Sequence, residues 1–143
     1  GGCINDRSKQ EKEALDSYGR NLGICFQITD DILDYSSKEK IFGKKIGNDF
    51  IEGKVTLPII LLFQKSNDQE REVIKSYFEK NNRSEKDFLN ILSLVKKYQI
   101  IETCKKRAEY FSNVASDALS IFEKNYVTEK LQELVFYIVN RVN

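Results

Sequence analysis

Residues 18–35 read YGRNLGICFQITDDILDY, and this stretch decides the fold class. Apolar or small side chains recur here and just before it at spacings of three and four residues, at Leu15, Tyr18, Leu22, Cys25, Phe26, Thr29 and Leu33. That spacing places them on one face of an α-helix. We therefore expect an amphipathic helix from Glu11 to about Tyr35 whose apolar face packs into a core.

The rest of the chain also favours helices. One proline and seven glycines are too few turn residues for an all-β fold. We expect a long ordered loop over Ser36 to Gly53 and a helix beginning at Thr56, which caps it, with Pro58 in the first turn. Further helices are expected over residues 68–80, 84–98 and 100–123, and from Val127 onward with Thr128 as a cap. The sequence predicts one all-α domain spanning residues 1–143.

Composition excludes several classes of function. The 143 residues are 41% hydrophobic and carry a net charge of +1, so no global positive field attracts nucleic acid. The absence of histidine excludes Ser-His-Asp triads and histidine-ligated zinc within this chain. The longest apolar stretch, residues 55–63, is short of the about 18 residues that a membrane span needs. Three cysteines without a C-x-x-C pair, Cys3, Cys25 and Cys104, predict reduced thiols in a cytoplasmic protein.

An acidic cluster lies at the end of the first expected helix. Gln27, Asp30, Asp31 and Asp34 share one helix face. The like charges repel one another, and the helix dipole disfavours anions near its C-terminus. Such carboxylates are ligands for Mg²⁺, which also binds substrate phosphates. The alternative is an acidic stripe that is merely solvated.

The next segment supplies positive charge. Glycines and lysines follow the acidic cluster, with Lys44 and Lys45 after Gly43, and Lys54 after Gly53. Glycine permits close approach of the main chain to a ligand, and ammonium groups bind phosphate oxygens. Each lysine alone is typical of a solvated surface, but carboxylates and lysines within 25 residues together predict a diphosphate site.

These residues resemble a known family. FQITDDILDY at 26–35, with YGRNLG at 18–23, resembles the second aspartate-rich motif of the trans-prenyl diphosphate synthases. Gly43-Lys44 and GNDFIEGKVTLP at 47–58 resemble the segment that follows this motif in the long-chain, octaprenyl-type members. The resemblance spans essentially the whole chain and corresponds to the C-terminal half of such a synthase.

The resemblance implies an antiparallel helical bundle of the isoprenoid synthase type. It also implies Mg²⁺-dependent condensation of an allylic diphosphate with isopentenyl diphosphate. By the resemblance, Asp30, Asp31 and Asp34 would hold Mg²⁺, with Asp30, Asp31 and Lys44 acting in catalysis. Lys44 and Lys54 would bind the diphosphate, and Gln27 would border the isopentenyl unit. Thr56 would support the metal ligands, and Asp49 would either support them or bind the metal through a water molecule.

Two departures leave alternatives open. Asn48 stands where long-chain members often have Asp, and the family's first aspartate-rich motif, upstream arginine pair and K-T signature do not occur in these 143 residues. In the first alternative, the chain is one half of an active synthase whose other half is supplied by the rest of the polypeptide or by a partner subunit. Alternatively it is a non-catalytic helical subunit that stabilises a complete synthase, or the product of a split gene. We expect the isolated chain to be inactive and to expose apolar patches that drive association.

Overall fold

The computed structural model describes residues 8–36 and 47–142, and every regular element in those ranges is helical. The all-α fold class is therefore confirmed. The helices form two compact units, one of residues 1–29 and 105–143 and one of residues 30–104. Helices α1 (Lys9–Tyr35) and α6 (Ile100–Ala118) each contribute to both units. The expectation of one domain over residues 1–143 stays a prediction.

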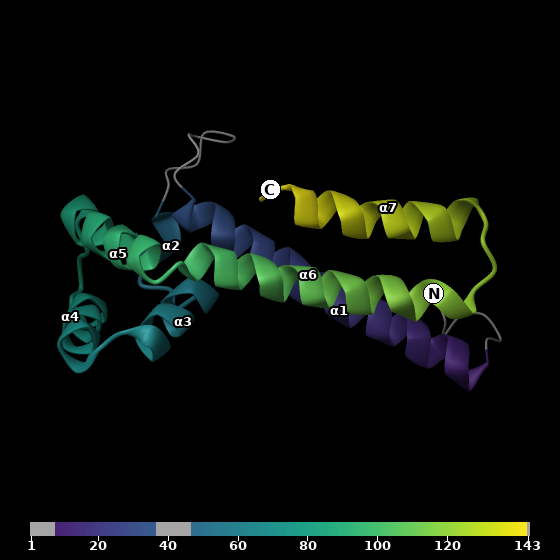
Figure 1. Ribbon diagram of the computed structural model, residues 1–143, viewed down its shortest axis with the longest axis horizontal. Helices are drawn as coiled ribbons and strands as arrows, with labels where there is room; N and C mark the ends of the chain where they lie inside the picture. Colours follow the sequence, from purple (N-terminus) through teal and green to yellow (C-terminus); the bar gives the residue numbers. More distant parts are fainter. Residues whose placement is uncertain (1–7, 37–46, 143) are drawn as a thin grey trace. The chain divides into compact units, whose positions relative to one another are not determined.

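The first unit is built from parts of α1 and α6, the 3₁₀ turn η1 (Leu119–Ile121) and α7 (Tyr126–Asn140). After η1 the chain reverses, and α7 runs back along α6 (Figure 1). The core contains Tyr18, Ala115, Leu119 and Val135, surrounded by Leu22, Ala118, Phe122 and Leu131. The Tyr18 hydroxyl donates a hydrogen bond to the carbonyl oxygen of Leu131 at 3.0 Å, and burial raises the pKa of Tyr18. Of the apolar face expected for the first helix, Tyr18 and Cys25 are buried, whereas Phe26 is 46% exposed.

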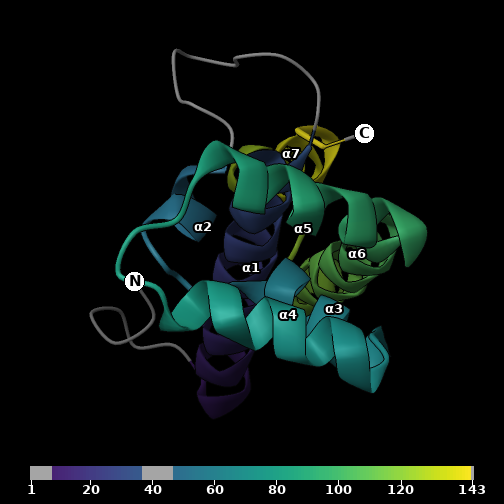
Figure 2. The same ribbon diagram turned by 90° about the vertical axis from the view of Figure 1, so that its left-hand side faces the viewer.

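The second unit packs around an aromatic cluster. It contains α2 (Asn48–Ile51), α3 (Leu57–Lys65), α4 (Asp68–Glu79) and α5 (Glu85–Lys97), and Figure 2 shows α4 and α5 in front of the other helices of this unit. Phe50 of α2 is fully buried. Its ring centre lies 5.5 Å from that of Phe78, 5.8 Å from that of Phe88 and 6.3 Å from that of Tyr77. The cluster therefore holds the short α2 against α4 and α5.

Side-chain caps explain where several helices begin. Asn67 and Glu70 form a capping box at the start of α4, and Ser84 and Asp87 form one at the start of α5. In a capping box two side chains satisfy backbone amides that have no partner within the helix. The helices expected at 68–80 and 84–98 are confirmed to within one residue at each end.

Three local expectations were wrong. The segment expected to be one loop contains α2, because Phe50 is buried among aromatic rings. The helix expected to reach residue 123 ends at Ala118, where η1 begins the turn toward α7. Asn125, not Thr128, occupies the N-cap position of the last helix and accepts hydrogen bonds from the amides of Val127 and Thr128, while the Thr128 hydroxyl completes a capping box by accepting a hydrogen bond from the Asn125 amide.

Two further expectations concern membranes and cysteines. No helix in the described ranges 8–36 and 47–142 combines the length and hydropathy that crossing a bilayer requires. Cys25 and Cys104 are fully buried, as expected for small core side chains, and Cys3 lies outside the described residues. The cytoplasmic location stays a prediction.

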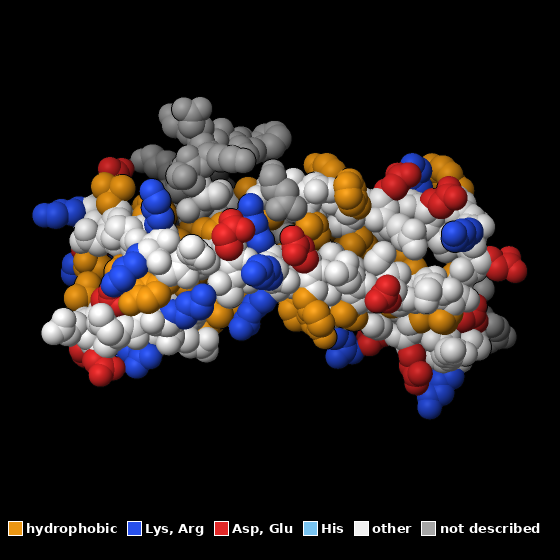
Figure 3. Space-filling view, viewed as in Figure 1, with side chains coloured by type: hydrophobic (Ala, Val, Ile, Leu, Met, Phe, Trp, Pro, Cys, Tyr) orange, Lys and Arg blue, Asp and Glu red, His pale blue; other side chains and the backbone are white. Residues whose placement is uncertain are grey.

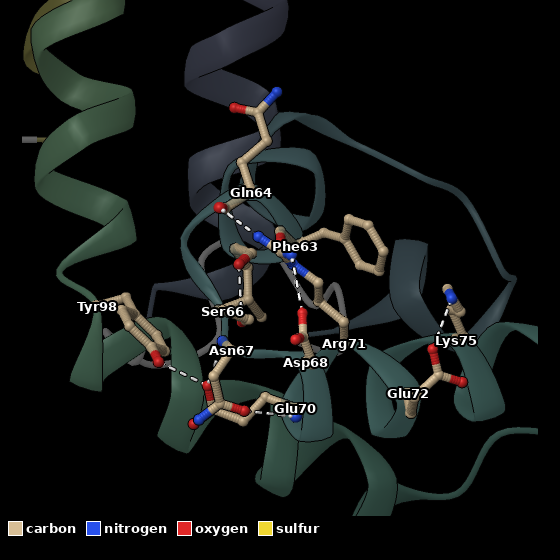
Figure 4. Close-up of polar contacts among 11 residues, drawn as sticks. Phe63, Gln64, Ser66, Asn67, Asp68, Glu70, Arg71, Glu72, Lys75 and Tyr98 are labelled. Atoms are coloured by element: carbon tan, nitrogen blue, oxygen red, sulfur yellow. Dashed lines mark hydrogen bonds and ion pairs between the residues drawn. The ribbon is translucent and has the colours of Figure 1, made fainter.

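Glu70 links α4 to the end of α5 (Figure 4). Its carboxylate accepts hydrogen bonds from the Lys97 ammonium at 2.7 Å and the Tyr98 hydroxyl at 2.6 Å, and from the Asn67 amide at 3.1 Å. The ammonium, the hydroxyl and then the amide lower the pKa of Glu70 to about 2. All three stabilise the ionised carboxylate.

Glu70 makes the stability of the fold depend on pH. Because its pKa in the folded chain is about 2 and its ordinary value is 4.5, its contribution is present above pH 4.5 and is lost as the pH falls toward 2. Glu70→Gln removes the titrating group, so we expect a shallower loss of unfolding free energy over that range in urea titrations. Glu79→Gln, an exposed change on the same helix, is the control, and equal slopes for all three proteins would contradict the assignment.

Phe50 should be central to the stability of the second unit. We expect Phe50→Ala to lower the free energy of unfolding by about 3 to 5 kcal/mol, because it removes a buried ring and leaves a cavity. Leu89→Ala, at a side chain that is 63% exposed on α5, is the control and should change stability by less than about 0.5 kcal/mol. Urea unfolding followed by circular dichroism measures both, and similar losses for the two variants would refute the role of Phe50.

Candidate functional site

The acidic end of α1 faces the segment of residues 47–57 in the second unit. The two carboxylate oxygens of Asp34 accept hydrogen bonds from the amides of Asn48 at 3.1 Å and Asp49 at 3.0 Å. The carbonyl oxygen of Asp34 accepts a third from the amide of Gly47 at 2.9 Å. Asp34 therefore supplies the cap of α2 that Gly47, at the N-cap position, has no side chain to provide.

Asp31 performs the same task for the next helix. Its side chain is buried, and one carboxylate oxygen accepts a hydrogen bond from the amide of Leu57, the first residue of α3, at 3.2 Å. The amides at a helix N-terminus lack partners within the helix and carry partial positive charge. These amides offset the repulsion that Asp31 and Asp34 experience at the C-terminal end of α1. Two of the three clustered acids thus have a structural explanation that the sequence did not reveal.

Asp30, Gln27 and Lys44 are the other residues predicted to form the site. Asp30 is half-buried near the end of α1, while Gln27 is exposed and belongs to the first unit. Lys44, predicted to bind diphosphate and act in catalysis, lies outside the described residues.

The residues fit Mg²⁺ only together with a phosphate ligand. Within residues 8–36 and 47–142, no three acidic or cysteine side chains converge on a position that would hold a metal ion. Mg²⁺ does not require such a cage, because it is commonly held by one or two carboxylates and takes its remaining ligands from phosphate oxygens and water. The carboxylates of α1 are the matching donor type.

Lys54 lies in the segment of residues 47–57, whose backbone amides at Asn48, Asp49 and Leu57 donate hydrogen bonds to Asp34 and Asp31. Its ammonium nitrogen lies 2.9 Å from a carboxylate oxygen of Asp49 and 2.8 Å from one of Glu52. The hydrogen bonds to Glu52 and Asp49 raise the pKa of Lys54, so the group stays protonated. The Lys54 side chain is 57% exposed, so a bound anion can reach its charge.

Two buried hydroxyl groups adjoin the same segment. Thr56 occupies the predicted cap position of α3, but its hydroxyl caps no amide. The hydroxyl oxygens of Thr56 and Tyr35 are buried without a hydrogen-bond partner in the described part of the chain. Burial raises the pKa of Tyr35, and the charges of Asp34, Asp49 and Asp31 add to that shift. Tyr35 is therefore neutral at physiological pH.

Gly47 and Gly53 serve packing within the protein. Both have left-handed backbone angles, with φ of 81° and 80°. A Cβ atom on Gly47 would lie 2.5 Å from the Phe88 ring, and one on Gly53 would lie 2.7 Å from the Arg83 guanidinium. The sequence interpretation assigned such glycines to approach by a ligand, but here the protein's own side chains occupy that space.

Sequence reasoning missed Arg83 and Phe50 as residues that shape this site. Arg83 follows two asparagines in the turn between α4 and α5, where nothing in the local pattern marks it. Phe50 follows Asp49 in a segment rich in glycine and charge, so its burial was not expected from periodicity. Only the packing of α2 reveals either role.

Comparison with known proteins relates the chain to enzymes of prenyl metabolism. Residues 1–95 match the family model described as polyprenyl synthetase. The octaprenyl diphosphate synthase of Haemophilus influenzae is 31% identical over 134 residues, which are 94% of this chain and 40% of that protein. The prenyl transferase of a Synechocystis strain is 30% identical and is covered to 42%. The chain thus spans about two fifths of the length of these relatives.

Solved structures agree with these sequence relatives. The decaprenyl diphosphate synthase of Rhodobacter capsulatus aligns with a TM-score of 0.86 at 31% identity, covering 99% of this chain and 43% of that one. The polyprenyl synthase of Caulobacter crescentus, in complex with calcium and isoprenyl diphosphate, aligns with a TM-score of 0.84 at 34% identity, covering 96% and 42%. The expected isoprenoid synthase type of bundle is therefore confirmed as the fold.

The capping role of Asp34 can be tested by one isosteric change. Asp34→Asn keeps one acceptor oxygen but places an amino group opposite the second amide of α2. We expect the free energy of unfolding to fall by about 1 to 3 kcal/mol, because a partly buried amide loses its acceptor. Asp68→Asn, at a side chain that is 99% exposed, is the matched control and should change stability by less than about 0.5 kcal/mol. Equal stability of the two variants would show that Asp34 does not cap α2.

Proposed function

The chain belongs to the polyprenyl synthetase family, and we propose that it forms the C-terminal half of a prenyltransferase. The complete enzyme condenses an allylic diphosphate with isopentenyl diphosphate in isoprenoid biosynthesis. The proposal rests on the carboxylate clamp, by which we mean the hydrogen bonds that Asp31 and Asp34 accept from backbone amides of residues 47–57. These bonds hold that segment, which includes Lys54, against the acidic end of α1. Carboxylates for a divalent cation and an ammonium for phosphate oxygens then border one position.

The chemistry of this reaction suits these residues. Breaking the allylic C–O bond leaves negative charge on pyrophosphate, and fixed positive charges stabilise it in the transition state. Lys54 stays protonated through its contacts with Asp49 and Glu52, and donates hydrogen bonds to diphosphate oxygens. Lys44 is proposed as a second donor. No histidine is needed, because the released pyrophosphate can accept the final proton.

Mg²⁺ is the proposed cofactor. The ion, when bound with diphosphate, neutralises charge on the leaving group. Asp30, Asp31 and Asp34 supply carboxylate oxygens on the protein side, and Asp49 and Thr56 support them. The Caulobacter relative, which was solved with calcium and isoprenyl diphosphate, supports an arrangement of divalent cation and diphosphate in this family.

The rest of the synthase is the proposed partner. The chain spans about two fifths of its relatives, so Gln27 and the other predicted residues form only part of an active site. Hydrophobic side chains reach the surface along α7 (Figure 3). The most exposed of them include Tyr126, Val127, Phe136 and Tyr137. We propose that the remainder of the synthase, on the same polypeptide or a second subunit, covers apolar surface of this kind.

An assay of pyrophosphate release tests the proposal. We expect no turnover by the 143-residue chain alone with Mg²⁺, an allylic diphosphate and isopentenyl diphosphate. We expect turnover after a polypeptide carrying the family's first aspartate-rich motif is added. In that assembly Lys54→Gln should lower kcat/KM about 100-fold, because one fixed positive charge is lost. Lys65→Gln is the control, since Lys65 binds the carbonyl of Tyr98 and the hydroxyl of Thr103 instead.

Three results would contradict parts of the proposal. Turnover by the chain alone would show that it is not half of an enzyme. Near-normal turnover of Lys54→Gln would exclude Lys54 from the diphosphate site. No turnover in any assembly, together with stabilisation of a complete synthase by this chain, would favour the non-catalytic subunit.

A further inference from the structure

Arg83 contacts the far end of α2 from the turn between α4 and α5. One guanidinium nitrogen donates to the carbonyl oxygen of Phe78 at 3.1 Å, and another donates to that of Ile51, the last residue of α2, at 3.4 Å. The guanidinium carbon lies 5.4 Å from the centre of the Phe78 ring. Arg83 therefore joins α4 to α2 through a planar group that is itself supported by a ring.

The same guanidinium packs against Gly53, the residue before Lys54. A Cβ atom at Gly53 would lie 2.7 to 2.8 Å from three guanidinium atoms, so a side chain there would displace the Arg83 guanidinium. Gly53 also needs its left-handed conformation, because the turn ends with the amide of Lys54 bonded to the carbonyl oxygen of Asp49 at 2.8 Å. The Arg83 guanidinium thus packs against the backbone of Gly53, the residue that precedes Lys54.

These contacts matter because α2 is only four residues long. A helix of this length does not form alone, since its few hydrogen bonds do not offset the cost of ordering the chain. Asp34 binds the amides at one end of α2, Phe50 is buried beneath it, and Arg83 binds the carbonyl at the other end. Lys54 comes shortly after the end of α2 in the sequence. Its ammonium forms an ion pair with Asp49, which belongs to α2.

We propose that Arg83 is a positioning residue for diphosphate binding, acting through Gly53 and α2 to hold the Lys54 ammonium where an anion meets it. This inference rests on the proposed function, in which Lys54 binds the diphosphate. Arg83 itself does not touch the ligand in this account. Its removal should weaken binding only through Lys54.

Arg71 provides a matched control in the same unit (Figure 4). It also donates to two carbonyl oxygens, of Phe63 at 3.0 Å and Gln64 at 3.1 Å, and its guanidinium lies 5.8 Å from the centre of the Phe63 ring. Its contacts hold the end of α3 to α4. Arg71→Met and Arg83→Met therefore remove the same kind of interaction at two places.

Calorimetric titration of inorganic pyrophosphate with Mg²⁺ into the 143-residue chain separates positioning from general stability. We expect Arg83→Met to raise Kd about tenfold, an effect on the scale of a hydrogen bond to a charged group, while Arg71→Met stays within about twofold of the natural chain. Because Arg83 acts through Lys54, the double variant Arg83→Met, Lys54→Gln should bind pyrophosphate no more weakly than Lys54→Gln alone. Arg83→Lys should recover part of the affinity, since its ammonium can still reach one carbonyl.

The outcomes distinguish this inference from the proposed function. If Lys54→Gln weakens pyrophosphate binding but Arg83→Met does not, or if the two changes add fully, the positioning role is wrong and the diphosphate site stands. Equal weakening by Arg71→Met and Arg83→Met would reduce Arg83 to a stabilising residue and overturn the inference. If the natural chain does not bind pyrophosphate, or Lys54→Gln binds it equally well, the proposed site and the inference both fail.

Discussion

The hydrogen bonds from backbone amides to Asp31 and Asp34 determine how the second unit presents its charged residues. The C-terminal end of α1 therefore binds the N-termini of two other helices. Asp34 accepts hydrogen bonds from the first amides of α2, and Asp31 accepts one from the first amide of α3. The carboxylates satisfy amides that would otherwise lack partners, and those amides offset the negative charge gathered at the end of α1. The position of Lys54 follows from this arrangement, because it lies between the two clamped points.

The same arrangement explains how acidic and basic residues coexist close to one another. Asp49 and Glu52 keep Lys54 charged, while the exposed part of its side chain stays accessible. Arg83 and Phe50 also hold the intervening α2, Arg83 through the carbonyl of Ile51 and Phe50 through the aromatic cluster. The ligand proposed above, a diphosphate with a divalent cation, would use carboxylates and an ammonium together.

Much of the fold followed from the sequence, because most helices are marked by local signals. The spacing of apolar residues predicted α1, and capping residues such as Asn67 and Ser84 stand where α4 and α5 begin. α2 could not be predicted this way, since its stability comes from contacts of Phe50 with Phe78 and Phe88, which lie about 30 to 40 positions later in the sequence. The acidic motif was recognised from its spacing. The hydrogen bonds that Asp31 and Asp34 accept, however, come from the amides of residues 48, 49 and 57, which only the tertiary structure brings near. Arg83 had no sequence signal because its role depends on facing Gly53. The assignments of Lys44, Gln27 and Mg²⁺ stay predictions.

Hydrogen exchange measured by NMR on the natural chain tests the carboxylate clamp most directly. The amides of Asn48, Asp49 and Leu57 precede the first intrahelical hydrogen bonds of their helices, so without an acceptor they would exchange at the rate of an unstructured peptide. The account predicts that all three are protected and exchange far more slowly than an unstructured peptide. Exchange of these three amides at unprotected rates, in a chain whose α3 and α5 amides are protected, would contradict it.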